Sequence, residues 1–219
     1  MIKLYGGGSS RVSIVQWYLE EIGVEYEYVM VDMAAGEHLQ PPFLELNPMG
    51  KVPVIVDGDI TLWESRAILL YLAEKYTQQV DTIEKRSITN QWILFANSTF
   101  ASGLFIEAIR EKEKEILLPA LDKIFATNSY VMGEEFTVAD VGLGTMLFHT
   151  QNLLQIDISA YANLTAYLEK LMQREGFKQS IGKRDSLPSQ RLPSLKVPKY
   201  YKYKKFLGNQ SLNHRAEKE

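Results

Sequence analysis

The chain has 219 residues, of which 46% are hydrophobic and 23% charged, so it can bury a substantial core in one large domain or two modest ones. Its formal net charge of −3 gives the whole molecule no electrostatic reason to bind nucleic acid. The sequence contains no cysteine, which excludes disulfides, thiolate metal ligands and a cysteine nucleophile. Its histidines, His38, His149 and His214, are too scattered to predict a metal site.

The beginning of the chain runs directly into a strand pattern, with no apolar segment behind a basic start. No apolar run approaches the ~20 residues needed to cross a bilayer. We therefore expect a cytoplasmic protein that does not insert into membranes.

Strand and helix patterns alternate over the first 76 residues. Strands are predicted at 2–5, 26–31, 52–56 and 60–62, and helices at 12–22 and 64–76. Two adjacent prolines make 36–46 a short or irregular helix, and Asp57-Gly58 is a typical hairpin turn. The order βαβ, α, ββα predicts a thioredoxin-like α/β domain at 1–76, although order alone leaves other small α/β domains open.

The remainder of the chain is predicted to be helical after a polar linker at 77–83. Helices are expected at 83–109, 111–125, from 137 onward, at 160–174 and at 176–181. The first of these is either one long helix or a kinked one that is loosened near Gly103. These form an all-helical domain at 84–182, followed by a basic tail at 183–219 rich in Pro, Lys and Tyr. The Lys/Tyr cluster at 199–206 either touches an anionic partner or packs its tyrosines on the body while its lysines stay in water.

The motif Asn47-Pro-Met-Gly-Lys-Val-Pro53 places a proline at the opening of the third predicted strand. If the bond between Val52 and Pro53 is cis, the N–H and C=O of Val52 point outward together, and an extended peptide can pair with this edge. The alternative is an ordinary edge proline.

Glu64 and Ser65 lie where the fourth predicted strand leads into a helix. The free N–H groups of a helix start attract a carboxylate, the Ser65 hydroxyl adds a donor, and Glu64 can accept an ammonium group. Together they fit the α-amino-acid end of a γ-glutamyl group. Each residue alone is also typical of a plain helix N-cap.

These motifs, with Leu-x-Glu-Ser-x-Ala-Ile-x-x-Tyr-Leu as the last, resemble the glutathione-binding half of the cytosolic glutathione S-transferase family from residue 1 to about residue 76. The pattern is similar to theta- and chi-like bacterial or cyanobacterial members. The resemblance implies that one cleft binds the backbone, the γ-glutamyl end and the glycine carboxylate of glutathione, through His38, Lys51, Val52, Pro53, Glu64 and Ser65.

Within that cleft, Val52 would pair with the cysteinyl backbone of glutathione, and Glu64 and Ser65 would hold the γ-glutamyl end. Lys51 and His38 would reach the glycine carboxylate. A solvated loop histidine is the alternative for His38.

The thiol of glutathione has a pKa near ~8.5, so the protein must stabilise the thiolate. In the family the activating residue lies just after the first strand, where this chain reads Gly6-Gly-Gly-Ser9-Ser10-Arg11. Ser9 or Ser10 can donate a hydroxyl hydrogen bond, and Arg11 can supply a guanidinium, which lowers the thiol pKa further. All three stay open, as does an outward-pointing Arg11, while Tyr5 is interpreted as structural.

The second half carries its own signature. Thr137 and Asp140 have the spacing of a capping box, flanked by staple positions Phe136 and Val141, and resemble the helix start of the family's helical domain. We assign them to structure rather than catalysis. Aromatic residues of the long helix are candidates for lining the electrophile pocket, although most such residues belong to cores: Trp92, Phe95, Phe100 and Phe105.

The resemblance implies an enzyme that ionises glutathione so that its thiolate attacks small electrophiles: isothiocyanates, aryl or alkyl halides, or hydroperoxides. Glutathione is then a co-substrate, no other cofactor is expected, and a homodimer is implied. Two alternatives remain: a non-catalytic binding or assembly module, and a glutathione-dependent isomerase with the same first-half site.

Overall fold

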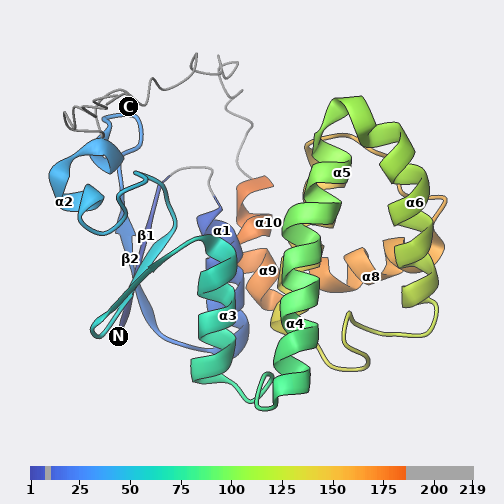
Figure 1. Cartoon of the computed structure of the whole chain (residues 1–219), viewed down its shortest axis with the longest axis horizontal. Helices are drawn as coiled ribbons and strands as arrows, with labels where there is room; N and C mark the ends of the chain where they lie inside the picture. Colours follow the sequence, from blue (N-terminus) through green and yellow to red (C-terminus); the bar gives the residue numbers. More distant parts are fainter. Residues whose placement is uncertain (8–10, 186–219) are drawn as a thin grey trace, which may run out of the picture. The chain divides into compact units, whose positions relative to one another are not determined.

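The computed structural model describes residues 1–7 and 11–185, and residues 1–186 form one compact unit. A sheet with its helices makes up the first half of this unit, and helices alone make up the second (Figure 1). The tail predicted from the sequence lies outside the described residues from residue 186 onward. Among the helices that the structure describes, none is long and apolar enough to cross a membrane.

The sheet has the strand order β2-β1-β3-β4. Strand β1 pairs in parallel with β2 and antiparallel with β3, and β3 pairs antiparallel with β4. The bounds are β1 (Ile2–Gly6), β2 (Tyr26–Met30), β3 (Val54–Asp57) and β4 (Ile60–Trp63). A parallel pair needs a crossover, and helix α1 (Val12–Ile22) supplies it, ending at Gly23 in the left-handed conformation (φ 64°).

The connection from β2 to β3 holds two short helices, η1 (Glu37–Leu39) and α2 (Pro41–Leu44), as the two prolines predict. Helix α3 (Ser65–Tyr76) follows β4 and completes the thioredoxin-like half. The predicted fold class, a thioredoxin-like domain followed by a helical one, is confirmed.

The second half consists of helices α4 (Ile83–Phe95), α5 (Ala101–Phe105), α6 (Glu107–Phe125), α7 (Val138–Asn152), α8 (Ala162–Met172), α9 (Glu175–Gln179) and α10 (Ile181–Asp185). The long or kinked helix predicted at 83–109 is interrupted by a π-helical turn, η2 (Ala96–Phe100), which lies between α4 and α5, and it stops short of residue 109. The end comes at Ile106, which is extended (φ −86°, ψ 109°), and not at Gly103. A Cβ on Gly103 would lie 2.9 Å from a methyl group of Leu117, so this glycine lets α5 pack closely on α6.

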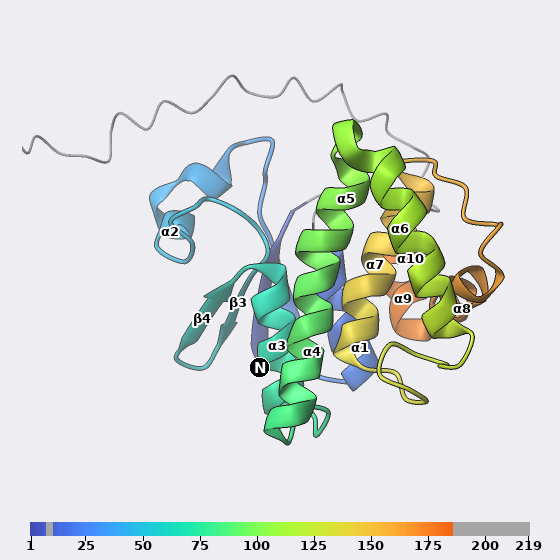
Figure 2. The same cartoon turned by 45° about the vertical axis from the view of Figure 1, so that its right-hand side comes forward.

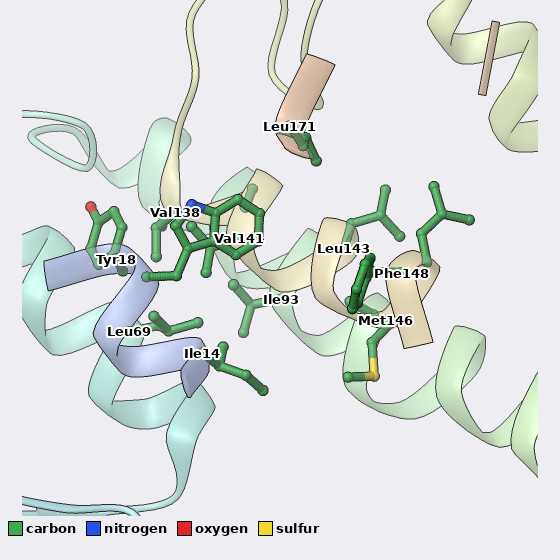
Figure 3. Packing of buried hydrophobic residues seen from close by; sticks show 14 of the residues in the cluster. Ile14, Tyr18, Leu69, Ile93, Val138, Val141, Leu143, Met146, Phe148 and Leu171 are labelled. Carbon is green, nitrogen blue, oxygen red and sulfur yellow. The ribbon is translucent and has the colours of Figure 1, made fainter. Parts of the chain in front are cut away.

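Helix α7 is buried along most of its length and lies beside α1 and α4 (Figure 2). Figure 3 shows side chains of both halves meeting there, with Ile14 and Tyr18 from α1, Leu69 from α3 and Ile93 from α4. Because one continuous apolar cluster spans the two halves, removal of this surface from water holds them together.

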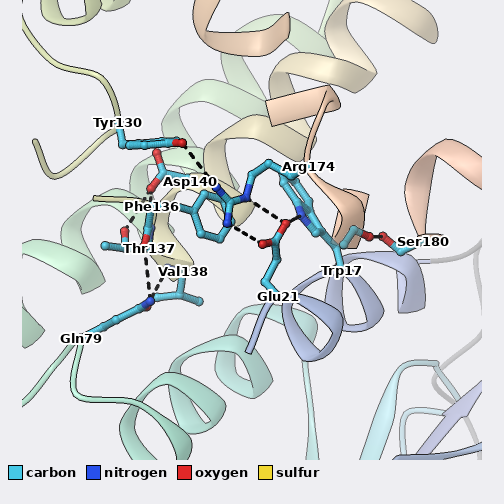
Figure 4. Close-up of polar contacts among 11 residues, drawn as sticks. Trp17, Glu21, Gln79, Tyr130, Phe136, Thr137, Val138, Asp140, Arg174 and Ser180 are labelled. Carbon is cyan, nitrogen blue, oxygen red and sulfur yellow. Dashed lines mark hydrogen bonds and ion pairs between the residues drawn. The ribbon is translucent and has the colours of Figure 1, made fainter. Parts of the chain in front are cut away.

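A polar cluster fastens α1 to the segment between α8 and α9 (Figure 4). The guanidinium of Arg174 donates to both carboxylate oxygens of Glu21, at 2.9 and 2.6 Å, and Trp17 donates its indole N–H to the same carboxylate at 2.9 Å. Arg174 also lies 3.8 Å above the ring centre of Phe136. Two hydrogen bonds therefore join Arg174 to Glu21, and the rings of Trp17 and Phe136 contact this ion pair.

The start of α7 has the predicted capping box. The hydroxyl of Thr137 accepts from the Ala139 N–H at 3.3 Å, and the carboxylate of Asp140 accepts from the Thr137 N–H at 2.7 Å. Asp140 also accepts from the Val131 N–H at 2.8 Å and from the Tyr167 hydroxyl at 3.0 Å. These residues have the structural role that their spacing predicts.

The linker side chain Gln79 bridges the two halves. Its carbonyl oxygen accepts from the Tyr18 hydroxyl at 2.9 Å and from the Val138 N–H at 3.1 Å. Its amide donates to the carbonyl of Phe136 at 3.4 Å. The segment predicted from its polarity as a linker therefore contributes hydrogen bonds to the helical half.

Candidate active site

A cavity of about 310 Å³ lies where the start of α1, the loop before β3 and the start of α3 converge. It is lined by Arg11, Asn47, Lys51, Val52, Pro53, Glu64 and Ser65. Most of the residues predicted from the sequence thus meet in one place. A larger hollow of about 660 Å³ beside β2 contains none of them.

The strand edge in this cavity has the predicted geometry. The peptide bond between Val52 and Pro53 is cis. Val52 precedes β3, which begins at Val54, and it forms no backbone hydrogen bond to any described residue. The peptide N–H and C=O of Val52 therefore form no hydrogen bond with the sheet, although Val52 lines the cavity.

The other wall is the junction of β4 and α3. Glu64 has a positive φ of 72° (ψ 111°), which is rare for a residue with a side chain and is typical of binding sites when it occurs. Its side chain does not cap α3, which excludes the plain N-cap alternative for Glu64. Ser65 is the first residue of α3 and is 2% exposed, so its hydroxyl lies beside the free N–H groups of the helix start.

The loop carrying Lys51 is held by Asn47, a residue that lines the cavity and for which the sequence motif predicts no separate role. The amide of the buried Asn47 donates to the Lys51 carbonyl at 2.7 Å, and its oxygen accepts from the Met49 N–H at 3.0 Å. Gly50 has φ +60°, and a Cβ there would lie 3.0 Å from the His38 carbonyl. The Asn47 side chain thus bridges its own turn, a pattern typical of Asn in turns that the motif already contained.

His38 lies in η1 and is not among the lining residues of the cavity. Its Nδ1 is buried and has no hydrogen-bond partner among the described residues. The structure places its loop next to Gly50 and hence next to Lys51.

Of the three candidate activators, the structure describes Arg11 only, because Ser9 and Ser10 lie outside the described residues. Arg11 directly precedes α1, is exposed and lines the cavity. The alternative in which this side chain points away from the cleft does not match that position.

Sequence reasoning missed two residues behind the cavity wall, Arg66 and His149. Arg66 is the second residue of α3, is 7% exposed, and has a pKa lowered to about 10 by burial and by Arg11. His149 lies in the last turn of α7, and burial, then Arg66 and Arg11, lower its pKa to about 4. The sequence indicated only that Arg66 lies near the site, because it directly follows Glu64 and Ser65. Its proximity to α7 depends on the tertiary fold and has no local signal.

The aromatic candidates divide by burial. Phe100 is fully buried in the core, whereas Phe105 is 37% exposed. Trp92 and Phe95 are half-buried and pack edge to face, with ring centres 5.5 Å apart. Phe100 therefore serves packing.

The chain matches two family models: that of the glutathione S-transferase N-terminal domain over residues 1–74, and that of the C-terminal domain over residues 117–170. It is 32% identical over 206 residues to "Glutathione S-transferase 3" of Zea mays, covering 82% of this chain and 93% of that protein.

Two solved structures are similar in both sequence and fold. A glutathione transferase family member from Pseudomonas fluorescens Pf-5, crystallised with two glutathione molecules, is 26% identical with a TM-score of 0.71, covering 81% of this chain and 91% of that one. A delta-class glutathione transferase from Nilaparvata lugens is 29% identical with a TM-score of 0.70, covering 82% and 92%. These relatives favour neither the binding module nor the isomerase, and the theta- or chi-like subtype stays a prediction. The chain therefore belongs to the cytosolic glutathione S-transferase family and is a glutathione transferase.

Proposed function

We propose that this enzyme binds glutathione in the cavity of about 310 Å³ and presents its thiolate to small electrophiles, among them isothiocyanates, aryl or alkyl halides and hydroperoxides. The observation that carries the proposal is the convergence of an unused strand edge, a helix start and two cationic side chains in one cavity. These four features match the backbone, the γ-glutamyl end, the glycine carboxylate and the sulfur of the tripeptide.

In this proposal Val52, beside Pro53, pairs with the cysteinyl backbone. Ser65 and the N–H groups of α3 hold the γ-glutamyl carboxylate, and Glu64 accepts from the ammonium group. Lys51 binds the glycine carboxylate, with His38 close by in the neighbouring loop. The positive φ of Glu64 supports a binding role, since strain of this kind persists where a ligand site requires it.

For thiol activation we propose Arg11, with Ser9 and Ser10 as the competing candidates. A guanidinium stabilises an anion by charge as well as by hydrogen bonds, so it increases the thiolate fraction at neutral pH. The thiolate then forms a carbon–sulfur bond with the electrophile, and a halide, where present, leaves with the electron pair of its bond. The remaining part of the rate enhancement comes from holding glutathione and the electrophile close together in a fixed orientation.

Isothermal calorimetry with glutathione tests the site. The wild type is expected to release heat of binding, and Glu64→Ala combined with Ser65→Ala is expected to abolish it. Absence of binding by the wild type, or full turnover by the double variant, would disprove the site.

A pH–rate profile tests the activator. Arg11→Ala is expected to raise the apparent thiol pKa of the bound glutathione by about one unit, which corresponds to about 1.4 kcal/mol. Ser9→Ala and Ser10→Ala serve as the comparison variants. An unchanged profile in Arg11→Ala would transfer the role to a serine.

We also propose that the enzyme acts as a cytoplasmic homodimer with a sheet domain at 1–76, a linker at 77–83 and a helical domain at 84–182. Large apolar side chains exposed on β4 and α4 support the dimer: Ile60, Trp63, Ile83, Ile88 and Leu94. Analytical ultracentrifugation tests the dimer. The wild type is expected to sediment as a dimer, and the double variant Trp63→Glu with Leu94→Glu as a monomer. A wild type that sediments as a monomer at micromolar concentration would disprove the proposal.

A further inference from the structure

A basic segment, residues 186–219, has a net charge opposite to that of the rest of the chain. It contains eight Lys and Arg and two Asp and Glu, which gives a formal net charge of +6. Residues 1–185 contain 16 Lys and Arg and 25 Asp and Glu, which gives −9. The overall charge of −3 therefore hides an asymmetry that is typical of a chain whose basic end binds an anionic partner.

Neither the family fold nor the glutathione cavity explains the basic segment. The match to the family's C-terminal domain ends at residue 170, and the compact unit extends to residue 186. The described residues that line the cavity all precede Arg66. The composition of the basic segment therefore calls for a role of its own.

Lysines and aromatic residues are interspersed in its centre. No Asp or Glu occurs between Asp185 and Glu217 to offset the positive charge. Clusters of about four to eight basic residues are attracted to anionic lipid headgroups, and aromatic rings favour the boundary between headgroups and acyl chains. Stable attachment to a membrane surface takes two such signals, and the stretch 199–206 contains both. It holds four residues of each kind: Lys199, Lys202, Lys204 and Lys205, with Tyr200, Tyr201, Tyr203 and Phe206.

Aliphatic residues around this cluster favour a lipid surface over a nucleic acid. The acyl chains of a membrane can bury such side chains, with a gain that grows with the apolar area removed from water. A nucleic acid would engage the lysines through its phosphates and the rings through its bases, but it offers little to aliphatic groups. The aliphatic residues nearest the cluster are Leu192, Leu195, Val197 and Leu207.

The rest of the chain offers few free cations to an anionic surface. At least seven of the 16 Lys and Arg in residues 1–185 form ion pairs with carboxylates. Two others, Arg11 and Lys51, line the cavity, and Arg66 is 7% exposed. Because acidic residues are in excess there, this part of the chain is repelled by an anionic surface, and the attraction has to come from the basic segment.

We propose that the basic segment binds the surface of membranes that contain anionic lipids, and so holds the enzyme at that surface without inserting it. In this proposal the lysines of 199–206 contact lipid phosphates, and the aromatic rings lie at the boundary with the acyl chains. The inference goes beyond the proposed function and does not depend on it, since none of these residues has a part in the proposed glutathione site.

Co-sedimentation of the full chain with lipid vesicles tests the proposal. Vesicles of phosphatidylcholine with about 30% phosphatidylserine should bind half of the wild type at about 0.1–1 mM accessible lipid in 0.1 M salt. Vesicles of phosphatidylcholine alone should bind at least about tenfold more weakly. Raising the salt to 1 M should also weaken binding at least about tenfold, because the Debye length falls from about 10 Å to about 3 Å.

A lysine variant and a matched control locate the attraction. The lysine variant should bind the anionic vesicles at least about a hundredfold more weakly than the wild type. The control loses four exposed lysines elsewhere, so its net charge changes equally, and it should bind like the wild type. Both should conjugate glutathione to a water-soluble aryl halide at the wild-type rate when no vesicles are present. The lysine variant is Lys199→Gln, Lys202→Gln, Lys204→Gln and Lys205→Gln, and the control is Lys85→Gln, Lys112→Gln, Lys123→Gln and Lys178→Gln.

An aromatic variant separates lipid binding from packing of the rings on the protein. It should bind the anionic vesicles about tenfold more weakly than the wild type and keep the dependence on salt. Its Tm should stay within about 1 °C of the wild type, whereas rings packed in the fold would lower the Tm by several degrees when removed. The variant is Tyr200→Ser, Tyr201→Ser, Tyr203→Ser and Phe206→Ser.

Four results would overturn the inference: equal binding to both kinds of vesicle, equal losses in the lysine variant and its control, a Tm lowered by several degrees in the aromatic variant, or tighter binding to a single-stranded DNA of about 20 nucleotides than to the anionic vesicles at the same salt. The last result would assign the basic segment to nucleic acid. A wild type that binds vesicles but not glutathione would overturn the proposed function and leave this inference standing.

Discussion

Replacing Glu21 by alanine should be among the most destabilising single changes outside the apolar core. Glu21 is 7% exposed in its side chain, and its carboxylate accepts two hydrogen bonds from Arg174 and one from Trp17. Without it, the Arg174 guanidinium keeps only the ring of Phe136 and a long hydrogen bond of 3.3 Å to the Tyr130 hydroxyl. The indole N–H of Trp17 also loses its acceptor.

Removing one partner of a fully buried ion pair costs about 3–5 kcal/mol. The Arg174 side chain is 29% exposed and can be partly rehydrated, so we expect a loss of about 2–3 kcal/mol for Glu21→Ala. For a chain of this size that loss corresponds to a fall in Tm of about 5–10 °C.

Urea unfolding followed by tryptophan fluorescence measures the effect. The double variant Glu21→Ala with Arg174→Met should lose less than the sum of the single variants, with a coupling energy of about 1–3 kcal/mol, because it leaves no unpaired charge. Glu175→Ala is the control, since its pair with Lys178 at 3.0 Å is exposed and should contribute less than about 0.5 kcal/mol. A loss below about 1 kcal/mol for Glu21→Ala, or strict additivity in the cycle, would refute the reasoning.

Three further changes test other parts of the structure. Thr137→Ala removes the α7 cap and should lower the free energy of unfolding by about 1 kcal/mol in urea titrations; an unchanged midpoint would contradict the cap. A Cβ on Gly144 would lie 2.4 Å from a methyl group of Leu171, so Gly144→Ala should cost about 1–3 kcal/mol, and a neutral result would show that Leu171 moves freely. Burial and nearby arginines lower the pKa of His149 to about 4, so the unfolded chain, with its pKa near ~6.5, takes up a proton first as the pH falls. The wild type should therefore lose about 2 kcal/mol relative to His149→Asn between about pH 6.5 and pH 4, after allowance for solvent around the half-buried ring, and parallel pH profiles would contradict this.

Local signals predicted the sheet half well. The hairpin at Asp57-Gly58, the end of α1 at Gly23 and the short α2 depend on residues whose backbone preferences act within a few positions. The capping box of α7 is local in the same way. The strand edge and helix start of the cavity follow from these elements, so Val52 and Ser65 could be placed together from the sequence.

Features that depend on distant contacts could not be predicted. The π-helical turn in the long helix accompanies the burial of Ala96 and Phe100, whereas Asn97, Ser98 and Thr99 remain exposed. Helices that follow this long helix in the chain decide which of its residues face the core. The π-helical turn shifts the buried face of the helix, and the hydrophobic periodicity of the sequence does not indicate this shift.

The basic residues behind the cavity, Arg66 and His149, could not be predicted to lie near each other, for the same reason. Arg66 and His149 are 83 positions apart, and nothing near either one indicates that they share an environment. The role of Asn47, by contrast, was accessible, because an Asn in a tight turn often bonds to its own loop.

Gln79 has a consequence for building hybrids of related enzymes. Its side chain accepts hydrogen bonds from α1 and from the first turn of α7. The segment that connects the two halves therefore makes specific contacts with both and does more than link them covalently. A chimera that grafts a foreign helical half after residue 76 must carry a matching partner for Tyr18. Where it does not, the chimera buries the Tyr18 hydroxyl between the two halves without an acceptor, and its folded state is less stable for that reason.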